Sequence, residues 1–91
     1  MLLSKNVTIG DTPTAIYRST SNGCHVYLSL PKNGESVTLG SADVQFGVGL
    51  GLDAKADGAN TINGMLPPGD TVYGICSTGL TQVIGVLVVE Y

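Results

Sequence analysis

The stretch Leu66–Tyr91, LPPGDTVYGICSTGLTQVIGVLVVEY, decides the fold that the sequence predicts. It is typical of a β-hairpin, with one strand over Thr71–Cys76 and a return strand over Gln82–Glu90. Ser77–Thr81 between them is rich in residues that form tight turns, because they bond the local backbone or tolerate positive φ. The return strand is apolar on both faces, so both faces need a cover, from a second sheet or from a neighbouring subunit.

A second clear strand lies earlier, at Cys24–Leu30, where apolar residues alternate with His25, Tyr27 and Ser29 on the opposite face. Asn-Gly pairs at 22–23 and 33–34 predict turns. Ala54–Asn63 is small and polar and is predicted to loop out. The further predicted strands are Leu3–Gly10, Thr12–Arg18, Ser36–Leu39 and Val44–Leu52.

No window of the sequence has the apolar spacing of a helix, whereas turn signals recur every 8–12 residues or so. The sequence therefore predicts an all-β fold: a single domain over residues 1–91, a β-sandwich or β-barrel-like arrangement of short antiparallel strands with little or no helix. We expect at least six strands. The residues expected to be mostly buried are Val26, Leu28, Val72, Ile75, Ile84, Val86 and Val88.

Composition favours a protein with partners. The chain has 91 residues, of which 43% are hydrophobic and only 12% charged, with a net charge of −3. Ordinary soluble domains are about 25% charged, and a chain this short buries only about 60–65% of its unfolded surface. Such a surface suits a protein that is held against another protein, and equally a compact β domain with a Ser/Thr/Asn surface.

Several classes of function are not supported by the sequence. The four basic residues are scattered along the chain, so no basic patch indicates binding to a nucleic acid. The first residues, MLLSKNVTIG, do not have the pattern of a signal peptide. No apolar run reaches the roughly 18 residues of a membrane-spanning helix, so we expect no membrane association.

The cysteines, Cys24 and Cys76, are expected to be reduced and buried, because no export signal accompanies them. A disulfide between them is the alternative. A zinc site is not expected, since the chain has only one histidine. We expect no metal and no other cofactor.

No group of residues predicts catalysis. His25 is the one candidate base. No sequence pattern ties it to a nucleophile or to one of the aspartates Asp43, Asp53, Asp57 and Asp70. We therefore interpret His25 as a surface or cross-strand residue and expect no enzyme activity.

Three weaker patterns have structural interpretations. DAKADGAN, residues 53–60, resembles half a calcium loop, but the register is wrong and the closing Glu is absent. The glycines at 47, 49 and 51 alternate as in a strand, and no helix follows them as a phosphate-binding loop requires. The tyrosines at 17, 27, 73 and 91 either form a stacking platform or, as we prefer, lie separately at the edge of the core.

One resemblance extends over the C-terminal two thirds of the chain. VTLGSADVQFGVGLGLDA, from Val37, and LPPGDTVYGICSTG, residues 66–79, are similar in turns and apolar positions to segments of small tailed-bacteriophage virion proteins. The resemblance implies a β-sandwich or barrel module of the capsid decoration, or cement, type, located on the surface of the virion and made in the host cytoplasm. It implies no catalytic residues.

Two functions follow as expectations. The first is a structural virion protein that binds the major capsid protein of an assembled phage head as a homo-oligomer, with a trimer favoured, and stabilises the shell by linkage. The second is a module that binds carbohydrate or a host surface. A tail or neck adaptor differs from the first only in where it docks.

The apolar start of the chain is the candidate partner-binding segment. Residues 1–4 form a possible N-terminal arm, in which Met1, Leu2 and Leu3 would dock on the shell or join a neighbour's sheet. A frayed terminus is the alternative.

Overall fold

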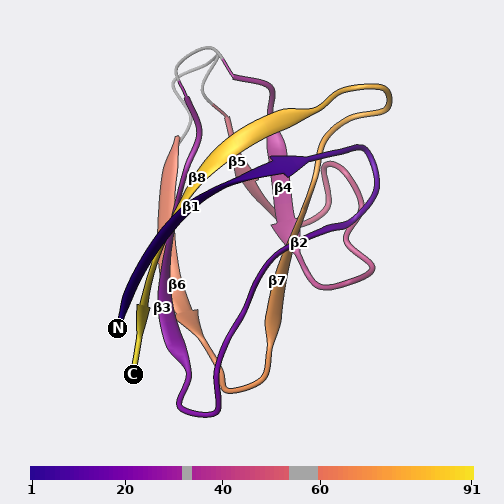
Figure 1. The fold of residues 1–91 in the computed structure, drawn as a ribbon. Helices are drawn as coiled ribbons and strands as arrows, with labels where there is room; N and C mark the ends of the chain where they lie inside the picture. Colours follow the sequence, from indigo (N-terminus) through magenta and orange to yellow (C-terminus); the bar gives the residue numbers. More distant parts are fainter. Residues whose placement is uncertain (32–33, 54–59) are drawn as a thin grey trace.

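The structure of the protein is a computed structural model that describes residues 1–31, 34–53 and 60–91. These residues form two antiparallel four-stranded sheets, with strand orders β1-β8-β3-β6 and β2-β7-β4-β5, and contain no helix (Figure 1). This arrangement is an eight-stranded jelly roll, which confirms the predicted all-β sandwich. The strands are β1 (Leu2–Ile9), β2 (Thr14–Arg18), β3 (Cys24–Ser29), β4 (Val37–Gly40), β5 (Leu50–Leu52), β6 (Thr61–Leu66), β7 (Thr71–Ile75) and β8 (Gln82–Glu90).

The sequence predicted that β7 and β8 pair as a hairpin, and this prediction is wrong. β7 pairs with β2 and β4, whereas β8 lies in the other sheet between β1 and β3. The turn itself exists, since Leu80 N–H donates to Ser77 O and Gly79 has a φ of 80°. Turn residues fix where the chain reverses, but they do not fix which sheet the next strand joins. The same holds for the Asn-Gly turn at 22–23, which carries the chain from β2 in the second sheet to β3 in the first.

The core lies between the sheets, and β8 runs through its centre. Ile84, Val86 and Val88 are at most 4% exposed and pack with residues such as Ile9 and Ile16. Of the expected core, Val26, Leu28, Ile75, Ile84, Val86 and Val88 are buried, and Val72 is half-buried against the cluster. A cover was expected on both faces of β8, but within the described residues only one face is covered, since Val83 and Leu87 on the other face are exposed.

The predicted strand over Val44–Leu52 is wrong for most of its length, because only Leu50–Leu52 is strand. Gly47 and Gly49 have φ angles of 84° and 145°, which L residues rarely adopt, and the bridge from Gln45 to Val48 closes a tight turn. The alternation of apolar residues with glycines has the period of a strand, but the positive φ angles of Gly47 and Gly49 bend the chain here.

The strand β6 differs from the sequence prediction, because its first half belongs to Ala54–Asn63, whose small and polar residues predict a loop. The structure pairs all six of its residues with β3, so pairing between strands outweighs the local preference for a loop. Residues 54–59 of that predicted loop, and Asn33 of the Asn-Gly pair at 33–34, lie outside the described residues.

Both cysteines are buried and free, as the sequence predicts. Cys24 begins β3, and Cys76 follows β7 and donates its S–H to Ile9 O. Burial raises the pKa of both thiols, and the nearby carboxylates of Glu90, at Cys24, and of Glu35 and Asp11, at Cys76, add to the shift.

The native protein is therefore expected to react only slowly with an aromatic disulfide reagent at neutral pH, because the thiolate is the reactive form and both sulfurs are shielded. Unfolding in urea should release two thiols per chain. A mass two hydrogens lower under non-reducing conditions, or two rapidly reacting thiols in the folded protein, would contradict this arrangement.

Candidate functional site

One face of the first sheet is built without charge. Alternation along the strands and the register between them place fourteen residues on the side of this sheet that faces away from the core. Within the described part of the chain, none of them is Asp, Glu, Lys or Arg. This set, called the uncharged face below, comprises Leu2, Ser4, Asn6, Thr8, His25, Tyr27, Ser29, Thr61, Asn63, Met65, Val83, Gly85, Leu87 and Val89.

Five large apolar or aromatic side chains of the uncharged face are open to solvent. Their exposed fractions are 65% for Leu2, 39% for Tyr27, 67% for Met65, 44% for Val83 and 37% for Leu87. Single exposed apolar residues are normal, whereas a group of them on one sheet face, rimmed by small polar residues, is typical of an interaction surface.

The outer side of the second sheet differs, because a segment of the chain covers part of it. Residues 41–49 lie against β4, where Gly47 N–H donates to Thr38 Oγ1 at 3.0 Å. A Cβ added to Gly49 would lie 2.5 Å from Leu39 O, so this close contact requires glycine. Thr38 is only 5% exposed as a result. No described segment covers the uncharged face in this way.

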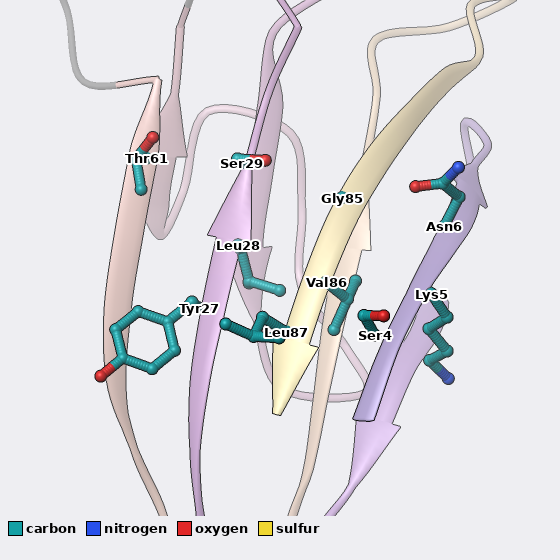
Figure 2. Close-up of a pocket in the computed structure, with 10 residues that line it drawn as sticks. All are labelled: Ser4, Lys5, Asn6, Tyr27, Leu28, Ser29, Thr61, Gly85, Val86 and Leu87. Carbon is teal, nitrogen blue, oxygen red and sulfur yellow. The ribbon is translucent and has the colours of Figure 1, made fainter. Parts of the chain in front are cut away.

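A shallow hollow of about 530 Å³ lies in the middle of the uncharged face. In Figure 2, Gly85 of β8 lies between Ser29 of β3 and Asn6 of β1, and the Tyr27 ring lies beside Leu87. An added Cβ at Gly85 would lie 2.9 Å from Ser29 Oγ, so the missing side chain keeps the hollow open.

The polar groups around the hollow are neutral and exposed. Ser4, Asn6, Ser29 and Thr61 contribute hydroxyl and amide groups that donate and accept hydrogen bonds. Lys5 also lines the hollow, but it alternates toward the other sheet, and its Nζ lies 5.4 Å from the centre of the Tyr17 ring. The hollow thus combines one aromatic ring with uncharged hydrogen-bonding groups.

His25 lies on the uncharged face, as its alternation predicts. Its Nε2 is 3.0 Å from Asn63 Oδ1, and its ring centre is 4.8 Å from that of Tyr27. Neither partner is a nucleophile or an orienting carboxylate. Of the aspartates that the sequence singled out, Asp43 accepts a bond from Ser41 Oγ at 2.7 Å within a turn, which is the main cause of its lowered pKa.

The candidate metal and stacking residues are not gathered into one site. The described residues contain no group of three His, Cys, Asp or Glu side chains placed to hold a metal ion. Asp57 of the calcium-like stretch lies outside the described residues. Tyr17 and Tyr73 belong to strands of the second sheet, whereas Tyr27 belongs to the first.

The candidate arm at the N-terminus lies on the first sheet. The amino group of Met1 donates to Glu90 O at 2.8 Å, and Leu2 and Leu3 pair with Val89 and Val88 of β8 (Figure 1). Leu2 projects from the uncharged face. Binding of a partner by these residues would therefore involve that face and the open edge of β1.

Sequence reasoning missed most of the site. It placed Tyr27 and Ser29 on one strand face, but Asn6, Met65 and Gly85 were not singled out. The signal that could have found the site is the sequence of β8, because apolar residues on both of its faces indicate a second apolar surface that needs a cover.

No helix in the described part of the chain is long and apolar enough to cross a bilayer. No family model matches the chain, and no curated protein sequence matches it.

One solved structure is similar in outline, and its description reads "Bacillus endospore appendages form a novel family of disulfide-linked pili". It is 14% identical, with a TM-score of 0.49 over 97% of this chain and 82% of that chain. At this similarity it carries no argument about what the present chain does, and the fold described above stands on the structure of the chain itself.

Proposed function

We propose that this chain is a non-enzymatic structural protein of a virion, a capsid decoration protein that binds the outside of an assembled phage head. The uncharged face is the docking surface in this proposal. Docking to the assembled shell in preference to free capsid subunits would stabilise the shell by mass action.

The observation that carries the proposal is the absence of charge from the described part of the uncharged face, combined with five exposed apolar or aromatic side chains. The main cost of covering an ordinary protein surface is the burial of charges without partners. The uncharged face avoids this cost, because its described residues include no Asp, Glu, Lys or Arg. The cores of protein interfaces are likewise depleted in charged residues and enriched in aromatic residues and methionine. The resemblance to small phage virion proteins supports the same assignment.

The test is to mix the purified protein with undecorated phage heads. We expect saturable occupancy on the heads and a higher temperature or chelator threshold for their disruption. Binding to isolated tails or necks instead of heads would favour an adaptor. No binding to any part of the particle would contradict the proposal.

A second candidate function is the binding of a neutral carbohydrate, and the hollow at Gly85 is the observation that favours it. An aromatic ring packs against the apolar face of a sugar, while Asn, Ser and Thr groups bond its hydroxyls. Tyr27, Asn6, Ser29 and Thr61 provide these groups around a volume that falls within the range of small-molecule pockets.

Titration calorimetry with neutral oligosaccharides separates the two candidates. Saturable heat that disappears in Tyr27→Ala, without occupancy of phage heads, would favour the carbohydrate module. Head binding without any saccharide response would favour decoration.

A further inference from the structure

Three of the four edge strands are protected against pairing with another chain. Open sheet edges invite such pairing, and natural proteins block it with charges, proline, bulges or short strands. β1 carries the inward-directed Lys5. β2 follows Pro13 and has a bulge between Ala15 and Tyr17. β5 has only three residues.

The fourth edge, β6, has none of these protections. Its six residues, TINGML, include no charge and no proline, and it pairs with β3 without a bulge. Met65 on this strand is 67% exposed. In Figure 1, β6 forms the border of the first sheet, with β3 as its neighbour.

The backbone groups on the open side of β6 follow from its pairing with β3. Leu30 N–H donates to Asn60 O at 2.7 Å, in register with the ladder between the two strands. Because hydrogen-bonded pairs alternate in an antiparallel ladder, every second residue from Asn60 faces β3. Thr61, Asn63 and Met65 therefore direct their N–H and C=O groups away from the sheet.

An apolar cleft of about 260 Å³ lies beside this edge, between the two sheets. Ile62 and Leu66 of β6 face it, and Leu50 across the cleft is 57% exposed. A further strand added to β6 would extend the first sheet over the mouth of the cleft and reduce its contact with water. Main-chain pairing combined with an apolar groove is how strand addition obtains both affinity and register.

We propose that the added strand is β6 of a second copy of this chain, paired around a two-fold axis that passes through the sheet at Asn63. This operation makes the two strands antiparallel. Asn63 then lies opposite the partner's Asn63, and Thr61 lies opposite the partner's Met65. All three residues with outward-directed backbone groups are paired in this register.

Charge favours a second copy as the occupant. A two-fold axis places β6 of one copy beside β6 of the other. Any charged residue on the strand would then lie near the same charge on the partner, and like charges directly opposite destabilise a sheet. β6 carries no charge. The axis is perpendicular to the sheet, so the uncharged faces of both copies lie on the same side of one eight-stranded sheet.

This inference does not depend on the proposed function, because pairing uses the edge of the sheet and docking uses its face. The pair is a dimer in solution, in contrast to the trimer that the sequence led us to expect. If both proposals hold, the dimer presents two docking surfaces side by side, which strengthens attachment without any new contact.

The test is the mass of the protein by light scattering across a concentration series at low salt, for the wild type and for Asn63→Lys. The wild type is expected to have the mass of two chains. Asn63→Lys places two ammonium groups opposite each other at the axis, so its dissociation constant should rise by about fivefold or more. Thr8→Lys adds the same charge to exposed β1 and should leave the dimer unchanged.

A charge swap completes the test and guards against a folding defect. Asn63→Asp should also weaken the dimer, and an equimolar mixture with Asn63→Lys should restore a mass of two chains, because opposite charges then meet. A wild type that stays monomeric or has the mass of three chains would overturn the proposal. So would a dimer that Asn63→Lys leaves intact, or a mixture that remains as dissociated as its components.

Discussion

Replacing Ile84 by alanine is expected to lower the free energy of unfolding by about 3–4 kcal/mol, within the range for large-to-small changes in a core. Ile84 is fully buried in β8 and lies on the side that faces the second sheet. Alanine removes three carbon atoms, and the two sheets hold the surrounding residues in place, so the cavity closes only partly.

The matched control is Val83→Ala, one residue earlier on the same strand. Val83 is 44% exposed on the uncharged face, and its change should cost about 0.5 kcal/mol or less. Urea denaturation of both variants at one protein concentration, with the wild type alongside, measures the difference. If both variants lost the same free energy of unfolding, the two faces of β8 would be equally buried, which would contradict this structure.

Replacing Leu87 by aspartate is expected to weaken docking strongly while the fold is retained. Leu87 lies near the middle of the uncharged face, beside the Tyr27 ring (Figure 2). A carboxylate there would be buried without a partner at the interface, so affinity for phage heads should fall at least about 30-fold, the loss typical of an interface hot spot.

The control for this variant is Ala15→Asp, which places the same charge on exposed β2 of the second sheet. It should bind heads as the wild type does. Occupancy is measured by sedimenting heads with increasing amounts of each protein, and circular dichroism verifies that both variants are folded. Equal binding by Leu87→Asp and the wild type would exclude the uncharged face as the docking surface.

The sequence predicted the class of the fold and most of its core because β3 alternates with period two and β8 is an almost continuous apolar run. Val26 and Leu28 were expected in the core from the alternation, and Ile84, Val86 and Val88 from the apolar run; all five are buried. The assignment of strands to sheets was not predictable in this way. In a jelly roll a turn frequently leads into the opposite sheet, so the turn after β7 reads as a hairpin although β8 pairs elsewhere.

Two local predictions were also wrong: the strand over Val44–Leu52 and the loop over Ala54–Asn63. Gly49 made a bent segment resemble a strand, because its alternation with apolar residues has period two although its φ is positive. The small, polar residues before Gly64 predicted a loop over Ala54–Asn63, yet pairing with β3 keeps Thr61–Leu66 extended. The uncharged face was equally hidden, since its residues come from four strands that only the register brings together.

The measurement that most directly tests the central claim is hydroxyl-radical footprinting of the protein, free and bound to phage heads. If the uncharged face is the docking surface, Tyr27 and Leu87 should lose most of their labelling on binding. Phe46 and Val48, which are 45% and 68% exposed in the segment against β4, should keep theirs. Unchanged labelling of Tyr27 and Leu87 on occupied heads, with protection of Phe46 and Val48 instead, would contradict the account.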